Sequence, residues 1–215
     1  MTLFDLTHPI SSGMPVYPGD PAVHVESALH VATDGVNVAQ LQLGSHTGTH
    51  LDAPAHVRSG GRTVDQLDLD LLHGEACVLP VRPDFIGHLA GQTVRVDDLV
   101  SIPADLPNIV CIATGWDQYF YAAQREQHPA LDLDLVKTLW DRGARVLGVD
   151  TLSPDATAGN TGAFPVHEFW LGQDGIIVEN LRSLTLLPQS VEMTILPLHL
   201  AGLDGSPVRA VAHLK

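Results

Sequence analysis

The segment HTGTHLDAPAH, residues 46–56, contains His46, His50, Asp52 and His56, and each of these four stands at an even position. Side chains alternate between the two faces of an extended chain, so the four side chains would project to the same side. A helix is disfavoured here, because the segment also contains a glycine and a proline. The pattern therefore predicts an extended strand that carries all four side chains on one face.

Imidazole and carboxylate groups that converge on one face are the ligands of a zinc- or manganese-type cation. His46, His50 and Asp52 supply three protein ligands and leave room for water or substrate, as catalytic metal sites do. His56 follows further along the same face, where a histidine that does not bind the metal can transfer protons. Two alternatives stay open: His56 is a fourth ligand or contacts a ligand, or the whole cluster is a polar network without a metal.

Outside this segment, short apolar stretches rich in β-branched residues and bounded by Gly, Pro or Asp predict strands. These stretches cover residues 36–44, 75–81, 108–115, 145–150, 175–180 and 191–202. Helices are predicted over residues 132–142, 164–171 and 96–100, the first because Leu135, Leu139 and Trp140 share one stripe. The helix that leads into residues 145–150 predicts a βαβ unit, whereas the C-terminal strands look antiparallel. We therefore expect an α/β fold in which one domain, residues 1–215, contains a mixed sheet.

The composition is that of an ordinary globular protein, with 45% hydrophobic and 17% charged residues among 215. A net charge of −14 argues against nucleic acid as a partner, because phosphate groups require a basic surface. We find no secretory leader, and no apolar run approaches the roughly eighteen residues of a membrane span. These features predict a cytoplasmic protein without a membrane partner. Cys77 and Cys111 lie in apolar stretches and are expected to be buried free thiols.

Two more candidate ligands, His167 and Glu179, flank a glycine-containing turn. Glu179 ends an apolar run, where a carboxylate is costly unless a positive group such as a cation meets it. Taken alone, each is more often a surface or paired residue than a ligand. Residues 116–129 are polar with interleaved aromatics, and we expect them to form a mobile flap or a subunit contact.

The chain resembles the metal-dependent cyclase-like hydrolases, the family that includes bacterial kynurenine formamidase (arylformamidase) and isatin hydrolase. HTGTHLDAPAH resembles the metal-binding signature of that family. Further similar stretches stand in the family's order: PVYPGD (15–20), ATGWDQY (113–119), GVDTLSPD (148–155), FPVHEFWL (164–171), IIVENL (176–181) and LPLHLAGLDGSPVRAVA (196–212). The resemblance covers nearly the whole chain, and it implies an α/β fold of the swivelling type that assembles as a homodimer or homotetramer.

The same resemblance implies a ligand set. His46, His50 and Asp52 would bind a first divalent cation, zinc or manganese. In members with two ions, the residue at Asp52 also reaches the second ion, which the residue at His167 binds. The residue at Glu179 touches both ions, so the chain would hold one or two.

The resemblance also identifies His56 with the catalytic histidine of the family, and Tyr17 with the position of a substrate-stacking tryptophan in kynurenine formamidases. A tyrosine ring can still stack on a substrate ring. The predicted function is metal-dependent hydrolysis of the C–N bond of a small amide (N-formyl, cyclic or aromatic) in which His56 protonates the leaving nitrogen. One alternative is a metal-dependent lyase, dehydratase or oxygenase, because two histidines and a carboxylate also suit non-haem iron. The other is a non-catalytic protein that binds a metal or a small molecule.

Overall fold

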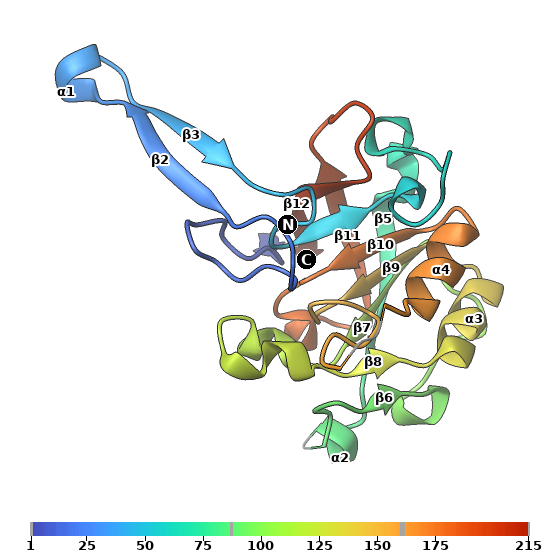
Figure 1. The fold of residues 1–215 in the computed structure, drawn as a ribbon. Coiled ribbons are helices and arrows are strands. Elements are labelled where there is room, and N and C mark those ends of the chain that lie inside the picture. Colours follow the sequence, from blue (N-terminus) through green and yellow to red (C-terminus); the bar gives the residue numbers. More distant parts are fainter. Residues whose placement is uncertain (1, 87, 160–161, 215) are drawn as a thin grey trace.

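The computed structural model describes residues 2–86, 88–159 and 162–214, and most of their strands belong to one mixed sheet. The spatial order of its eight strands is β1-β12-β11-β5-β7-β9-β10-β4, and a further pairing of β4 with β12 closes it into a barrel (Figure 1). The strands are β1 (Thr2–Asp5), β4 (His50–Asp52), β5 (His73–Pro80), β7 (Ile109–Ala113), β9 (Val146–Val149), β10 (Ile176–Glu179), β11 (Ser190–Pro197) and β12 (Gly205–Leu214).

Four neighbouring strands, β5, β7, β9 and β10, run parallel, and the other pairings in this sheet are antiparallel. Between β7 and β9 the chain forms helix α3 (Leu133–Asp141), so the predicted βαβ unit is confirmed. The helix begins after Asp132, whose side chain accepts a hydrogen bond from the backbone N–H of Asp134, and Leu135 and Leu139 are buried beneath it. The predicted α/β fold with a mixed sheet is therefore confirmed.

Alternation along the strands divides the buried residues between two cores. Residues such as Val178 on β10 and Leu51 on β4 point into the barrel. Ile177 points outward, into a second core beneath α3 and α4 (Pro165–Gly172), which includes Trp170. Because neighbours on a strand face opposite ways, the residues on either side of Leu51, and Glu179 on β10, project to the outer surface that α4 covers.

A separate hairpin projects from the barrel as an arm (Figure 1). It consists of β2 (His24–Leu29), the single-turn helix α1 (Val31–Asp34) and β3 (Val38–Gln42), and every residue from 24 to 42 is exposed. The strand predicted over residues 36–44 thus exists in shortened form, but it pairs with β2 and not with the main sheet. Alternating apolar residues indicated a strand correctly, yet they did not reveal that neither face is covered.

The remaining elements are short. They include strands β6 (Thr93–Val94) and β8 (Ala130–Leu131) and helix α2 (Pro83–Ile86). The helix predicted over residues 96–100 is one 3₁₀ turn, Val96–Asp98. Residues 116–129 form two 3₁₀ helices, Trp116–Tyr119 and Ala123–Gln127. In the part of the chain that the structure covers, no helix combines the length and apolar character needed to cross a bilayer.

Candidate active site

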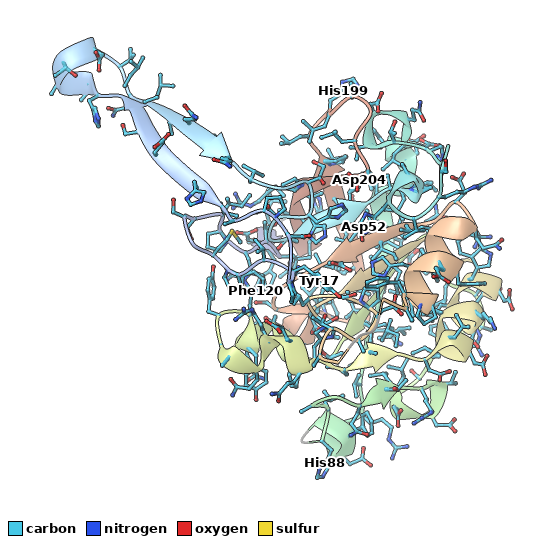
Figure 2. The ribbon with its side chains drawn as sticks, in the orientation of Figure 1. Tyr17, Asp52, His88, Phe120, His199 and Asp204 are labelled. Carbon is cyan, nitrogen blue, oxygen red and sulfur yellow. The ribbon has the colours of Figure 1, made fainter. Side chains whose placement is uncertain are left out.

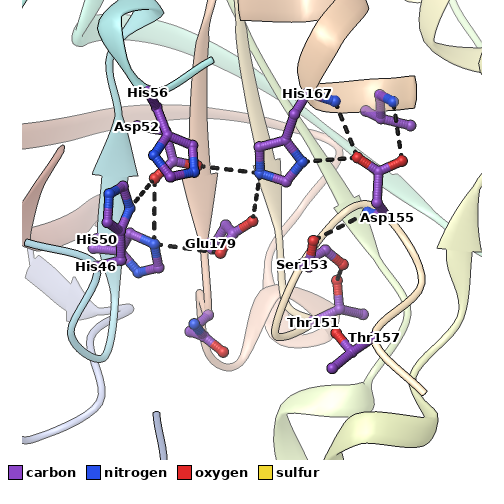
Figure 3. A network of polar contacts seen from close by, with 12 residues as sticks. His46, His50, Asp52, His56, Thr151, Ser153, Asp155, Thr157, His167 and Glu179 are labelled. Carbon is purple, nitrogen blue, oxygen red and sulfur yellow. Dashed lines mark hydrogen bonds and ion pairs between the residues drawn. The ribbon is translucent and has the colours of Figure 1, made fainter. Parts of the chain in front are cut away.

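The four residues of the HTGTHLDAPAH segment do meet, but not on one strand as predicted. Only His50–Asp52 is extended, as β4. His46 lies in the loop before β4, and His56 ends a 3₁₀ helix, Pro54–His56. The prediction of a single strand was therefore wrong, although the residues it selected come together (Figure 3).

Turns on either side of β4 bring the outer two histidines back. Gly48 has a left-handed backbone (φ +64°), which lets the chain reverse direction between His46 and His50. On the other side, Pro54 starts the 3₁₀ helix and ends the strand. As a result the rings of His46 and His56 lie with centroids 4.1 Å apart.

Asp52 and Glu179 form the centre of the cluster. Asp52 Oδ1 lies 2.7 Å from His46 Nδ1 and 3.3 Å from His50 Nε2. Its Oδ2 lies 3.6 Å from His167 Nε2, on helix α4. Glu179 contacts two of these three imidazoles: its carboxylate lies 3.3 Å from His50 Nε2 and 3.2 Å from His167 Nε2. The five predicted ligands therefore form two groups that share Asp52 (Figure 3).

In each of the three imidazoles of these groups, one ring nitrogen contacts an acceptor outside the two groups. His50 Nδ1 donates to the backbone carbonyl of Gly48 at 2.8 Å, so its Nε2 is left to face the carboxylates. His167 Nδ1 lies 2.7 Å from an oxygen of Asp155, and His46 Nε2 lies 2.9 Å from Asp204. An acceptor on one ring nitrogen fixes the tautomer and frees the other nitrogen as a ligand, an arrangement typical of metal-binding histidines.

The charges in the cluster are strongly interdependent. Burial alone would lower the pKa of His50, but Asp52 and Glu179 raise it to about 10. Burial likewise opposes ionisation of Asp52, yet His50 and His167 hold the pKa of that carboxyl well below its usual range. The carboxylates thus stay charged only in the presence of positive charge, which a divalent cation would supply directly.

Two features of the described residues test whether a cation fits. Asp52 Oδ2 and Glu179 Oε1 are buried and accept no hydrogen bond from the described residues, although His167 Nε2 lies 3.6 and 3.2 Å away. Such an arrangement is expensive unless something else binds these oxygens. None of the described residues that line the adjoining cleft is a lysine or an arginine. Nitrogen and oxygen donors of this kind suit zinc, manganese or iron, so the residues fit a divalent metal.

His56 stands beside the cluster without contacting its carboxylates. Its Nδ1 lies 3.0 Å from Asp204 Oδ2, the same oxygen that His46 approaches. Burial opposes ionisation of Asp204, but hydrogen bonds from the two histidines lower the pKa of the carboxyl to about 2. Asp204 is therefore a carboxylate that joins a candidate ligand to the candidate proton-transfer residue.

The cluster opens into a cleft of about 510 Å³. Tyr17 and Phe164 contribute aromatic rings to its lining, and Asp20 follows Tyr17 in the same loop. The cleft also exposes His56 and Val57 at its margin. Such a space, with rings on its wall and polar groups at its base, suits a small aromatic molecule.

Three acidic residues of the site were not predicted: Asp20, Asp155 and Asp204. Asp155 accepts hydrogen bonds from the backbone N–H groups of Val166 and His167 as well as from the His167 ring, so it holds the first turn of α4. Asp20 and Asp204 lie in PVYPGD and in the loop between β11 and β12. All three stand in stretches that resemble the family, but no local pattern distinguishes them from turn-forming aspartates.

Solved structures share this fold along their length. An isatin hydrolase bound to the product analogue thioisatinate superposes with a TM-score of 0.86 at 22% identity, covering 99% of this chain and 92% of that chain. Isatin hydrolase A from Ralstonia solanacearum gives 0.85 at 24% identity, covering 100% and 92%. A protein from Bacillus stearothermophilus described as a "predicted metal-dependent hydrolase" gives 0.77 at 26% identity, covering 98% and 97%.

The cyclase family model matches residues 4–156, which include His46, His50, Asp52 and His56. The match spans well over half of the chain, and the structural neighbours carry the same α/β fold to both ends. The resemblance expected from the HTGTHLDAPAH segment is thus confirmed, and the chain belongs to the cyclase family.

Proposed function

We propose that this protein is a metal-dependent hydrolase of the C–N bond in a small amide. The observation that carries the proposal is the pair of histidine–carboxylate groups sharing Asp52, with His56 beside them and an aromatic-lined cleft above. Isatin, an aromatic cyclic amide, gives two of the similar proteins their name, which supports an amide as substrate. Aromatic formamides of the kynurenine formamidase type are the second class to test.

The metal would be held by His46, His50 and Asp52, and a second ion by Asp52, His167 and Glu179. When bound, a divalent ion supplies Lewis acidity and a source of nucleophilic water near neutral pH. We expect zinc or manganese, because these ions suit imidazole and carboxylate ligands.

The protein's own residues would position the amide and move the proton. Tyr17 and Phe164 would pack against the substrate ring in the cleft. His56 donates from Nδ1 to Asp204, so its Nε2 is the atom that would deliver a proton to the leaving nitrogen. The Asp204 carboxylate would stabilise the positive imidazole while it carries that proton.

The test is turnover of isatin and N-formylkynurenine by the zinc- and manganese-loaded protein. In His56→Ala we expect kcat to fall about 10²- to 10⁴-fold, the usual contribution of a general acid–base group, at unchanged metal content. His88→Ala is the matched control, because His88 is exposed and far from Asp52 (Figure 2). Full activity of His56→Ala would refute its role, and inactivity of the metal-loaded wild type on every amide would refute the hydrolase proposal.

We also propose that the protein is a homodimer or homotetramer whose arm, residues 24–42, contacts a second copy. An isolated two-stranded hairpin is only marginally stable in water. The arm exposes paired apolar residues, with Val25 opposite Leu41 and Leu29 opposite Val38. Glu26 and Asp34 are its only charged residues. A second copy of the chain, which would offer the same apolar surface in return, is therefore the partner that fits.

Light scattering coupled to gel filtration tests the arm. Val25→Asp combined with Leu41→Asp should reduce the molar mass to that of one chain, because each charge would lie in the contact. Leu186→Asp is the control, since Leu186 is 72% exposed and lies outside the arm. An unchanged mass of the double variant, or a monomeric wild type, would contradict this assignment.

A further inference from the structure

A separate group of side chains able to bind a metal lies on the outer face of the barrel, away from the candidate active site. His73 on β5, Glu192 on β11 and His213 on β12 come from three neighbouring strands. Their neighbours along the strands, such as Met193 and Ala212, point into the barrel core, so alternation places these three outside. The group shares no residue with the candidate active site, and His213 lies at the opposite end of β12 from the Gly205 that pairs with β4.

The three side chains are close enough to share one ion. One ligand atom from each lies within 4.8 Å of the other two, and His73 Nε2 is 3.6 Å from Glu192 Oε1. Ligands of a tetrahedral zinc ion are separated by about 3.3 Å, a distance that follows from zinc–ligand bonds of about 2.0 Å. The side chains of His73 and Glu192 are 54% and 44% exposed, so small rotations can close the difference.

Both imidazoles are already oriented by a common neighbour. The hydroxyl of Thr194 lies 2.9 Å from His73 Nδ1 and 2.8 Å from His213 Nε2. Thr194 thus leaves two ring nitrogens uncontacted: His73 Nε2, which faces Glu192, and His213 Nδ1. His213 Nδ1 is buried and has no hydrogen-bond partner among the described residues. Histidines that bind a metal through one ring nitrogen usually form a hydrogen bond to a polar group through the other.

The charges nearby also favour a cation. Glu192 stands directly opposite Glu75 in the antiparallel β5–β11 pair, where like charges destabilise the sheet. Both glutamates line a groove of about 420 Å³ together with His213. A cation bound there would relieve the repulsion between the two carboxylates.

We propose that His73, Glu192 and His213 form a peripheral zinc site, separate from the active site, which ties β5, β11 and β12 together. Two imidazoles and a carboxylate suit zinc among the divalent ions. Bound zinc would hold the C-terminal strand β12 to the middle of the sheet, so its effect is on stability and not on turnover. The proposal stands on the geometry of this surface and is independent of the proposed hydrolase activity.

The experiment is a zinc titration by calorimetry, on protein whose active site has first been saturated with metal. We expect the wild type to bind one more zinc ion per chain than His73→Ala or Glu192→Gln at micromolar free zinc. Thr194→Val should weaken this binding about 10- to 100-fold, since Thr194 orients both rings. His199→Ala is the control, because it removes an exposed histidine outside the group and should leave binding unchanged.

A second measurement guards against variants that fold poorly. Zinc should raise the melting temperature of the active-site-saturated wild type but not that of Glu192→Gln, while amide turnover stays equal in both. Equal zinc uptake by the wild type and His73→Ala, or an equal rise in melting temperature in Glu192→Gln, would overturn the proposal. Neither result depends on whether the protein hydrolyses amides.

Discussion

Asp155 joins a helix start to a candidate metal ligand through one carboxylate. It accepts from the backbone N–H groups of Val166 and His167 at 2.9 and 3.0 Å, and contacts His167 Nδ1 at 2.7 Å. It is buried, so none of these donors can turn to water without cost. The direction of the imidazole and the position of α4 are therefore set together.

For this reason Asp155→Asn should weaken metal binding at the active site about 10- to 100-fold, because the amide places an N–H₂ group against a donor. Competition with a chromogenic chelator measures the affinity. Asp132→Asn is the matched control, since Asp132 caps helix α3 and asparagine caps equally well. Unchanged affinity in Asp155→Asn would show that His167 needs no support from it.

At this scale the sequence identified residues better than conformations. His46, His50 and His56 were selected by an even spacing that assumed a strand, yet a left-handed glycine and a 3₁₀ turn bring them together. Asp204 could not be found in this way, because it reaches His46 and His56 from about 150 positions away. A contact of that kind depends on how distant strands pack, which local spacing does not encode.

At the scale of the elements, the pairing of β4 with β12 explains why residue 205 is a glycine. Gly205 is the residue opposite Asp52, and the imidazole of His46 lies over it. A Cβ atom on Gly205 would lie 2.6 Å from Cε1 of that ring, so a side chain at this position excludes the ring.

We therefore expect Gly205→Ala to displace His46, lower metal affinity at the active site and reduce the free energy of unfolding by about 1–3 kcal/mol, the usual cost of overpacking. Calorimetric metal titration and chemical denaturation measure the two effects. Gly172→Ala is the control, because a Cβ atom on Gly172 would meet no other atom within 4 Å and the backbone there is not left-handed. Wild-type affinity in Gly205→Ala would contradict the packing argument.

Elements with a regular pattern were predicted well, as β7, α3 and β9 show. The helical stripe of Leu135 and Leu139 and the apolar runs on either side define that unit locally. By contrast, β4 has only three residues, too few to establish a period, and it joins partners on β10 and β12 far along the chain. In the arm, residues 24–42, the sequence predicted the strand over 36–44 but not its exposure, because alternation looks the same whether or not a face is covered.

At the scale of the whole molecule, His8 connects the segment that follows β1 with the loop before β4 and with residues 116–129. The backbone N–H of His8 donates to Thr49 Oγ1 beside β4, and its ring stacks on Phe120 with centroids 4.0 Å apart. The residue is only 7% exposed, and burial lowers the pKa of His8 to about 4 from its usual 6.5.

This shift predicts a loss of stability in acid. The unfolded chain takes up a proton on His8 near pH 6.5, and the folded chain does so only near pH 4. The stability that the neutral, buried His8 contributes is therefore complete above pH 6.5 and is lost as the pH falls towards 4. A difference of this size corresponds to about 3 kcal/mol. His8→Phe keeps a stacking ring without the titration, so urea unfolding at pH 7 and pH 4.5 should show a smaller acid loss than in the wild type. His88→Phe, at an exposed position outside the arm, should behave like the wild type, and equal acid sensitivity of His8→Phe would contradict the assignment.

The family and the α/β class could be predicted for the whole chain because ordered motifs cover nearly all of it. Closure of the sheet could not be predicted, because it depends on the pairing of β4 with β12 in addition to β10. A net charge of −14 acts on the whole molecule: its field would attract divalent cations, which favours the proposed metal site.

Because β4 pairs on both edges, one short segment closes the barrel and also carries two of the proposed metal ligands. Its backbone bonds to β10 on one edge and β12 on the other, while the side chains of His50 and Asp52 extend from the same three residues. An ion bound by those side chains would also hold β4 against β10 and β12, and separation of β4 from either strand would move the ligands away from the ion. Binding of the proposed ion and pairing of β4 with its two neighbours would therefore be coupled, and removal of the ion should weaken the barrel first at β4.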